Sequence, residues 1–531
     1  MSLPPQAASV LERAAEAARD RAAGRLAGLQ AQDAHWSAEL TADASLESDY
    51  VLFLLWRHPP RNGQWQPDAL PLVRKAVQSI LDRQLPDGGF GIYAQGPSEV
   101  GASVKAYAAL KLGGLPADLP SMERLRGRIL ELGGIQAAPI GVKFDLSLFH
   151  LFPRRGCPSL PPEAWLLPFG LPNRIPSWAR ATLVPLSVLY AANPRRPVPA
   201  GIALDELWLP GAGPARFSAV DRLLKWWDRH GSAALRRKAM RKAGEWIAES
   251  LSHPDAFHPT MYSVMALDVL GYAEDHPLRA EALRQFDRLM VDGQRFLLPP
   301  APDAAPGNPA VPPSIDGLLA MQSRDGGCPA FGAANYGRFA SQPPCADITG
   351  RVLEALAACG VDRGHPAVLR GVQWLVRNQE PDGSWYGRWG VAYIYGTCFA
   401  LRGLAAAGES DREAHILRAG EWLRSVQNAD GGWGETCVGC DHAAFAPAPS
   451  SPSHTALAIL GLVAGGDAAS LSVRQGIRFL ADAQRPDGSW DEPLAGGTGF
   501  PKVFYLNYHL YKDYFPLLAL SAFVKARNGM D

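Results

Sequence analysis

One short segment of the chain has the residue types of a metal site. Cys437 and Cys440 are separated by two residues, and His442 follows them. Two thiols and an imidazole could bind zinc, but a structural zinc site takes four ligands, and no second ligand pair at matching spacing is present. The chain also lacks the Asp-Asp-x-x-Asp magnesium motif, which speaks against chemistry that ionises a diphosphate. We therefore expect no metal and no cofactor.

A second segment combines tryptophan with a cluster of cations. Trp226 and Trp227 precede a basic stretch at residues 235–242. A basic amphipathic helix with tryptophan favours the interface of an anionic membrane. The alternative is an ordinary solvated helix face, and both interpretations stay open at this point.

Charge and composition exclude several classes of protein. The 531 residues include 52 basic and 52 acidic side chains, so the formal net charge is zero and nucleic acid is not an expected partner. The seven cysteines form no disulfide framework and fit a reducing compartment. The first residues form a charged amphipathic pattern, so we expect no secretory signal. No apolar run approaches the roughly 18 residues that span a bilayer.

The elements that must position any functional residue are helices, because one phrase recurs along the chain. A helical run ends in Gln, and Asp-Gly, one residue and an aromatic follow shortly after. Such repetition at intervals of roughly fifty residues indicates one helical unit that is stacked many times. The copies end at Asp87-Gly88-Gly89-Phe90, Asp382-Gly383-Ser384-Trp385, Asp430-Gly431-Gly432-Trp433 and Asp487-Gly488-Ser489-Trp490.

The segments between these copies complete the repeat. Residues 349–356 and 455–462 are rich in Ala and Leu and have the spacing of buried inner helices. The Asp-Gly steps are expected to end helices, because Gly tolerates the left-handed conformation there. Helix, turn and helix in repetition predict an all-α protein, an α/α barrel or solenoid.

A proline-rich stretch at residues 298–313 interrupts this pattern. It cannot be helical, and we interpret it as the connection between two halves of the chain. A weaker copy of the phrase follows, from Ile315 through Gln322 to Cys328, with Cys in place of the aromatic.

Besides the repeated phrase, four segments in a characteristic order complete a resemblance to the class II triterpene cyclases. This family comprises the squalene-hopene and oxidosqualene cyclases, and its hallmark is the Gln-to-Trp (QW) phrase. The similarity runs from about residue 35 to the C-terminus. The four segments are Ser177-Trp178-Ala179-Arg180-Ala181-Thr182, Tyr262-Ser263-Val264-Met265-Ala266-Leu267, Gly387-Arg388-Trp389-Gly390-Val391-Ala392-Tyr393-Ile394-Tyr395-Gly396-Thr397 and Phe500-Pro501-Lys502-Val503-Phe504-Tyr505-Leu506-Asn507-Tyr508-His509-Leu510-Tyr511.

The resemblance implies two α/α barrels that enclose an apolar cavity. Residues 1–30 and 310–531 would form a discontinuous catalytic barrel, and residues 31–300 would form a second, inserted barrel. The repeated tryptophans would brace the outer layer of helices rather than take part in the chemistry.

Asp347 lies where the resemblance places the catalytic aspartate, at the start of an inner helix. Protonating an unactivated alkene requires a strong acid in a dry cavity, and a buried carboxylic acid can supply it. The alternative is an aspartate that only caps the helix. The flanking residues, Cys345 and Ile348, differ from the Asp-x-Asp-Asp-Thr pattern of squalene-hopene cyclases and look more like the branch that protonates an epoxide.

His454 precedes another inner helix, where the oxidosqualene branch carries a cysteine that contacts its acid. We therefore expect His454 to hydrogen-bond Asp347 and orient it. The alternative is a helix-cap histidine without a catalytic part.

Aromatic faces stabilise carbocations by cation–π attraction without trapping them. Four of the aromatic candidates are spaced by four, four and three residues, which plain packing of a helix would also produce. The positions that the resemblance assigns to the cavity lining, and so to substrate binding, are Trp178, Tyr393, Phe500, Phe504, Tyr508 and Tyr511.

The resemblance implies an enzyme, an isomerase that closes the rings of a linear isoprenoid, squalene-like or its epoxide, after protonation. It also implies a monotopic protein on the cytoplasmic side of a membrane and leaves a homodimer open. The chain is markedly shorter than the family before Ile315, so the pocket and its substrate are expected to differ. The alternatives are a non-catalytic isoprenoid-binding homologue and a zinc prenyltransferase β-subunit, which shares the barrel.

Overall fold

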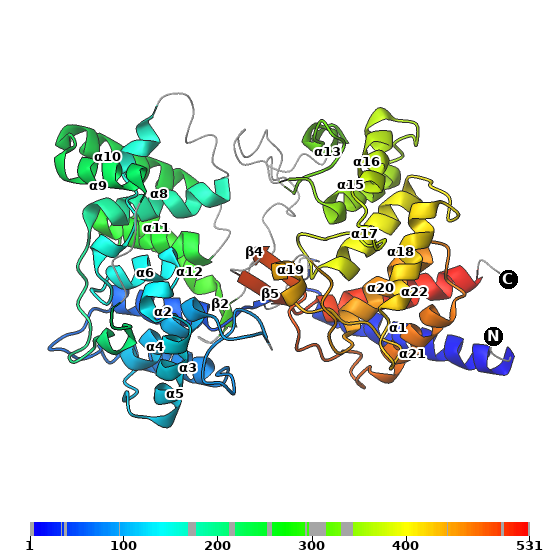
Figure 1. Ribbon diagram of the computed structural model, residues 1–531, viewed down its shortest axis with the longest axis horizontal. Helices are drawn as coiled ribbons and strands as arrows, with labels where there is room; N and C mark the ends of the chain where they lie inside the picture. The colour runs from blue at the N-terminus through cyan, green and yellow to red at the C-terminus, as the bar shows by residue number, and fades with distance from the viewer. Residues whose placement is uncertain are drawn as a thin grey trace. The chain divides into compact units, whose positions relative to one another are not determined.

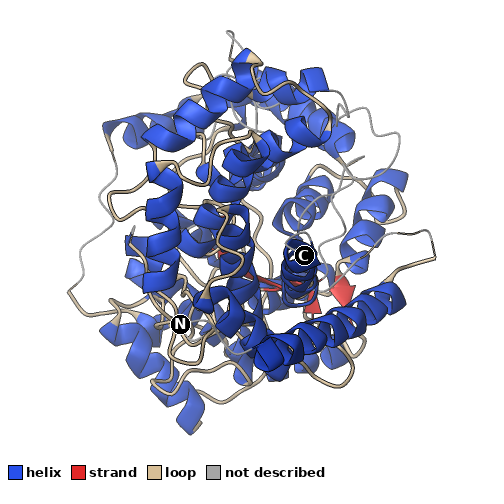
Figure 2. Cartoon of the chain, turned by 90° about the vertical axis from the view of Figure 1, so that its right-hand side faces the viewer, coloured by secondary structure: helices blue, strands red, loops and turns tan. Residues whose placement is uncertain are grey.

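The computed structural model shows a helical protein, in which the few strands are short (Figure 2). It describes residues 5–32, 34, 36, 40–94, 96–167, 177–211, 218–251, 257–291, 295–296, 315–330, 343–442, 444–500 and 504–528. The prediction of an all-α architecture built from helical repeats is confirmed. The proline-rich connection at 298–313 lies outside the described residues.

The chain divides into two compact units, whose elements are labelled in Figure 1. Unit 1 combines the chain up to Thr41 with the described residues from Ile315 onward, and unit 2 comprises the described residues from Ala42 to Phe296. The domain boundaries predicted near residues 30 and 300–310 stay predictions.

Unit 1 contains most of the QW repeats. Its elements are α1 (Pro5–Leu29), β1 (Leu40–Thr41), α13 (Ile315–Met321), α15 (Ala346–Ala358), α16 (Pro366–Arg377), α17 (Tyr393–Ala406), α18 (Ala414–Ser425), α19 (Val438–His442), α20 (Pro452–Ala464), α21 (Leu471–Asp482), β4 (Gly497–Phe500), β5 (Phe504–Tyr508) and α22 (Tyr511–Asn528).

Unit 2 is built in the same way and adds several 3₁₀ turns. Its helices and strands are α2 (Ser45–Arg57), α3 (Leu70–Leu81), α4 (Val100–Leu112), α5 (Pro120–Glu131), α6 (Ile140–Ser147), α8 (Ser177–Ala192), α9 (Ala219–His230), α10 (Ala233–Ser250), α11 (Phe257–Val269), α12 (Pro277–Arg288), β2 (Met290–Val291) and β3 (Arg295–Phe296).

Inner and outer helices alternate along each repeat. The inner helix α20 is buried along nearly its whole length, from Pro452 to Leu462. The outer helix α21 buries only one stripe, with Val473, Ile477 and Leu480 at helical spacing. The α/α layering therefore follows from the hydrophobic pattern of each helix.

The repeated phrase joins each outer helix to the next one. The Gln379 side-chain amide donates to the carbonyl of Gly383 in its own turn and to that of His415 in the first turn of α18, both at 2.8 Å. The Trp385 indole is fully buried and donates to the Leu375 carbonyl at 2.8 Å. The same Gln contacts recur at Gln84, Gln322, Gln427 and Gln484.

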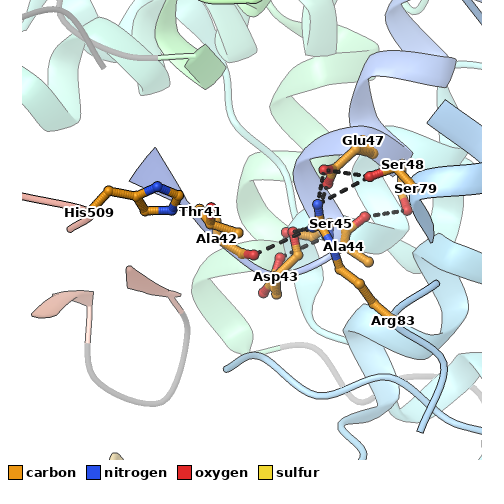
Figure 3. A network of polar contacts seen from close by, with 10 residues as sticks. All are labelled: Thr41, Ala42, Asp43, Ala44, Ser45, Glu47, Ser48, Ser79, Arg83 and His509. Carbon is orange, nitrogen blue, oxygen red and sulfur yellow. Dashed lines mark hydrogen bonds and ion pairs between the residues drawn. The ribbon is translucent and has the colours of Figure 1, made fainter. Parts of the chain in front are cut away.

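Two local networks fix the ends of elements near residues 41–47 (Figure 3). In unit 1, the Thr41 hydroxyl at the end of β1 lies 2.7 Å from Nε2 of His509, directly after β5. In unit 2, the buried Glu47 in the first turn of α2 pairs with Arg83 at 2.6 Å. A buried carboxylate needs such a partner, because desolvation without one is costly.

Candidate active site

Asp347 is the second residue of α15 and is completely buried. Its Oδ1 accepts a hydrogen bond from the backbone N–H of Arg388 at 3.3 Å, and Oδ2 accepts one from that of Trp389 at 3.1 Å. The residue that caps α15 is Cys345, so Asp347 is not the N-cap. Its side chain binds the segment before α17 and not its own helix.

The thiol of Cys345 hydrogen-bonds the Asp347 carboxyl. Burial raises the pKa of Cys345, and the negative charge of Asp347 raises it further. The thiol therefore stays protonated and acts as a donor. Cys345, which departs from the family pattern, thus contributes a third hydrogen bond to the acid.

His454 lies in the first turn of α20 and is buried. Its Nε2 lies 2.9 Å from the Val391 carbonyl oxygen, and its Nδ1 lies 2.8 Å from the Ser451 hydroxyl. A carbonyl only accepts, so Nε2 carries the proton and Nδ1 accepts from Ser451. Burial lowers the pKa of His454 to about 4, which keeps the ring neutral.

The predicted hydrogen bond between His454 and Asp347 is not formed. Both ring nitrogens already have other partners. The start of α20 places the ring against Val391, two residues beyond the Trp389 amide that holds Asp347. His454 therefore acts on the segment that binds the acid and not on the acid itself.

Glu435, which the sequence analysis did not single out, anchors the same segment. It is completely buried and accepts hydrogen bonds from the backbone N–H groups of Tyr393 and Ile394 at 2.9 to 3.0 Å, at the start of α17. Burial raises the pKa of Glu435 to about 7. The positive end of the helix dipole favours a carboxylate at this place.

A signal in the sequence could have found Glu435 and a related residue. Glu435 stands two residues after Trp433, and Glu492 stands two residues after Trp490. Glu492 is also buried, and it accepts a hydrogen bond from the hydroxyl of Ser453 in the first turn of α20. The corresponding residue after Trp385 is Gly387, so that repeat has no such carboxyl.

A second missed residue, Arg351, lies one helical turn after Asp347 on α15. Its Nη2 donates to the Tyr395 hydroxyl at 2.9 Å, and its guanidinium carbon lies 3.9 Å from the ring centroid of Phe399. A cation within an inner helix that is otherwise rich in Ala and Leu was the signal in the sequence. The acid and a part-buried cation therefore share one face of α15.

Three of the six predicted lining residues have described side chains, and all are tyrosines of unit 1. Tyr393 is buried at the start of α17, 5.6 Å from Tyr386 by ring centroids. The rings of Tyr508 and Tyr511 stack with centroids 4.6 Å apart. The side chains of Trp178, Phe500 and Phe504 lie outside the described residues.

The spacing from Phe500 to Tyr508 does not come from packing of a helix, the alternative to pocket lining. Phe500 ends strand β4, Phe504 begins strand β5, and the two residues are paired in an antiparallel hairpin. Only Tyr511 begins a helix, α22. Residues spaced by four can belong to either element, because four is also a multiple of the strand period of two.

The Cys-x-x-Cys segment forms a tight turn in which the Cys440 amide donates to the Cys437 carbonyl at 3.0 Å. The side chain of His442 lies outside the described residues. In the described part of the chain, no three potential ligands among His, Cys, Asp and Glu lie together. The expectation of no metal stays a prediction.

Comparison with known proteins decides the family. The model of the squalene-hopene cyclase N-terminal domain matches residues 20–295, and that of the C-terminal domain matches residues 301–525. The chain belongs to the squalene-hopene cyclase family. It is 32% identical to the squalene-hopene cyclase of Zymomonas mobilis, over 93% of each chain. It is also 32% identical to that of Alicyclobacillus acidocaldarius, over 96% of this chain and 97% of the relative.

More distant relatives and chain length complete the comparison. The dammaradiene synthase of Dryopteris crassirhizoma is 27% identical over 93% of this chain and 91% of its own. The chain is accordingly a class II triterpene cyclase, an enzyme that starts polycyclisation of a polyprenoid by protonation.

The chain is shorter than its relatives. The alignment with the Zymomonas enzyme spans 618 positions, whereas this chain has 531 residues, so part of the relative has no counterpart here. The predicted place of this shortening, before Ile315, lies outside the described residues.

Proposed function

We propose that this cyclase closes the rings of a linear polyprenoid, squalene-like or its epoxide, and that Asp347 donates the initiating proton. The observation that supports Asp347 is its complete burial together with a fixed orientation, because backbone amides hold both of its oxygens. A buried acid at a fixed position avoids reorganisation during the reaction.

The tyrosines of unit 1 would accompany the carbocations. Burial raises the pKa of Tyr393 to about 12, so its hydroxyl stays neutral. A neutral phenol ring offers a π face to a passing cation, worth up to about 2 kcal/mol when desolvated. Tyr508 and Tyr511 offer a stacked pair of such faces.

The test compares three buried acids of unit 1. We expect purified enzyme to convert squalene or oxidosqualene to cyclic products that mass spectrometry detects, and the Asp347→Asn variant to lose about 10²–10⁴-fold in rate. Glu492→Gln is the matched control, since it removes a buried carboxylate at the start of an inner helix that does not hold the segment bonded to Asp347, and it should keep the rate within about tenfold. Glu435→Gln removes an anchor of that segment, so its rate should lie between those of the other two variants.

The control variants also define the contrary result. If Asp347→Asn turns over at the wild-type rate while Glu492→Gln is inactive, the proton donor is Glu492. If none of the three affects turnover, the acid is not in this part of unit 1.

We further propose that the enzyme attaches to the cytoplasmic face of a membrane through α9 and α10. Val220, Leu223 and Trp226 follow one another at intervals of three on α9 and are 54 to 66% exposed. Exposed cations lie on α10 at Arg237 and Lys238. No described helix is long and apolar enough to cross a bilayer. An apolar stripe beside cations suits the surface of an anionic membrane.

One residue of the predicted basic stretch does not belong to this surface. Arg236 pairs with Glu163 at 2.6 Å and with Asp228 at 3.1 Å. Its charge is therefore already compensated within unit 2.

A further inference from the structure

The segment that binds Asp347 runs directly into α17, and Glu435 holds the first turn of that helix. The residue before α17 is Ala392, whose side chain makes no capping hydrogen bond. The first backbone N–H groups of a helix have no partner within it, so they need an acceptor from elsewhere. The Glu435 carboxyl accepts from the amides of Tyr393 and Ile394 at 2.9 to 3.0 Å. It also accepts from the amide of Ala392.

Close backbone packing joins the first turn of α17 to the residues that bind the acid. The Gly387 amide donates to the Ala392 carbonyl at 2.8 Å and closes residues 387–392 into a tight loop. A Cβ on Gly396, in the first turn of α17, would lie only 2.4 Å from the Gly387 nitrogen. The two residues that follow Gly387 carry the amides that bind the acid. A displacement of the first turn of α17 therefore moves these amides as well.

Titratable groups of three elements lie around Glu435 and this loop. On α17, burial and the charges of nearby carboxylates raise the pKa of the Tyr393 phenol to about 12, so it stays neutral. On α20, burial keeps the His454 ring neutral. On α19, whose Gly439 packs against the carboxyl, the described titratable side chain is Cys440. None of these groups brings a positive charge near neutral pH, so the backbone amides are what binds Glu435.

The carboxylate form of Glu435 is the form that fits these amides. Both of its oxygens accept from the Tyr393 N–H, and Oε2 also accepts from that of Ile394. A protonated carboxyl or a carboxamide turns one of the acceptors into a donor, which then faces an N–H group. Burial raises the pKa of Glu435 to about 7, so the carboxyl changes between its two forms near neutral pH.

We propose that Glu435 is a positioning residue of the cyclase, whose negative charge holds in place the amides that bind Asp347. These amides stabilise the carboxylate that Asp347 becomes after it has given its proton to the substrate. Glu435 itself takes no part in the proton transfer. The proposal rests on the proposed function of Asp347 and adds a residue that does not touch the acid.

The test compares kcat and KM of wild type and Glu435→Gln with squalene and oxidosqualene. In alkaline buffer, where wild-type Glu435 is charged, the variant should have a kcat about tenfold to hundredfold lower, with KM within about twofold. Wild-type Glu435 takes up a proton as the pH falls through about 7, so the two kcat values should converge in acidic buffer. Groups that both proteins contain, His454 and Glu492 among them, cancel in this ratio.

Two further variants separate the charge of Glu435 from its packing. Glu435→Asp keeps the charge but is shorter by one methylene group, so its kcat should be intermediate and should still fall in acidic buffer. Glu492→Gln removes another buried carboxyl whose pKa is raised to about 7 by burial. Its kcat should stay within about tenfold of wild type, by the same factor at both pH values. Thermal unfolding of each variant shows whether the fold is intact.

Amide hydrogen exchange tests the proposal without turnover. At one alkaline pH, the amides of residues 387–391 should exchange faster in Glu435→Gln than in wild type, although Glu435 itself bonds residues 392–394. Glu492→Gln should leave the exchange of residues 387–391 unchanged.

The outcomes distinguish this proposal from the proposed function. If Glu435→Gln keeps the wild-type kcat in alkaline buffer, or its deficit is the same in acidic buffer, positioning by the charge of Glu435 is refuted. A wild type that converts neither squalene nor oxidosqualene refutes the proposed substrates, and hydrogen exchange then decides about Glu435. Faster exchange of residues 387–391 in Glu435→Gln supports the positioning role, and unchanged exchange refutes it.

Discussion

Carboxyl groups occupy the first turns of three inner helices of unit 1. Glu435 reaches the start of α17 and Glu492 the start of α20 from the turns after two repeat tryptophans, whereas Asp347 belongs to α15 itself. Only Asp347 is bonded by backbone amides of the segment that leads into α17. The same segment is held further along by His454, at the Val391 carbonyl, and by Glu435, at the Tyr393 amide. The position of the acid thus depends on residues that never touch it.

The neutral state of His454 makes a prediction about acid stability. The ordinary pKa of histidine is 6.5 and burial lowers that of His454 to about 4, so between these values the unfolded chain binds a proton that the folded chain does not. Stability is therefore present above pH 6.5 and is lost as the pH falls toward 4. Between pH 7 and pH 5 we expect wild-type enzyme to lose about 2 kcal/mol more unfolding free energy than His454→Gln.

Urea unfolding at the two pH values measures this difference. Glu435 and Glu492 titrate in the opposite sense, but they are present in both proteins and cancel in the comparison. An equal loss in wild type and variant would show that the ring is not buried in its neutral form.

At the scale of the elements, two glycines set the distance between α15 and α17. A Cβ on Gly403 of α17 would lie 2.5 Å from the Cα of Gly350, and a Cβ on Gly350 would meet the Phe399 carbonyl oxygen. These are backbone atoms and cannot turn aside. The close crossing brings Arg351 over Phe399 and next to Tyr395.

We expect Gly403→Ala to destabilise the cyclase by about 1–3 kcal/mol, because an added methyl group forces the two helices apart. The matched control is Gly24→Ala on α1, where a Cβ meets no atom within 4 Å. The control should be stabilising by about 0.5–1 kcal/mol, since alanine favours a helix over glycine. Denaturant unfolding monitored by tryptophan fluorescence measures both, and equal stabilisation of the two variants would contradict the close crossing.

At the scale of the whole molecule, attachment to a membrane concerns unit 2. We expect the cyclase to co-sediment with vesicles of phosphatidylcholine and phosphatidylglycerol, and added salt to weaken binding because it screens the cations of α10. The double variant Leu223→Ser and Trp226→Ser should lose most of its bound fraction. Leu417→Ser on α18, where Leu417 is also about half exposed, is the control and should bind as the wild type does.

Undiminished binding of the α9 variant would place the membrane surface elsewhere. Binding that ignores both salt and the substitutions would indicate adsorption without a defined surface.

The sequence alone determined the helical repeat, because its signals are local. Gln, Asp-Gly and an aromatic at fixed spacing form hydrogen bonds within one turn and to the next helix. Each copy, such as the one ending at Trp385, therefore determines its own contacts between neighbouring outer helices. It also indicated Asp347, through the order of motifs along the chain.

Only the tertiary structure decided which residues meet. His454 and Asp347 lie 107 positions apart in the sequence, and whether they touch depends on how α15, α17 and α20 are packed. The partner of His454 proved to be the Val391 carbonyl, because the packing of α20 brings the buried ring against it. The roles of Glu435 and Arg351 likewise depend on contacts across helices, which residue type and spacing do not encode.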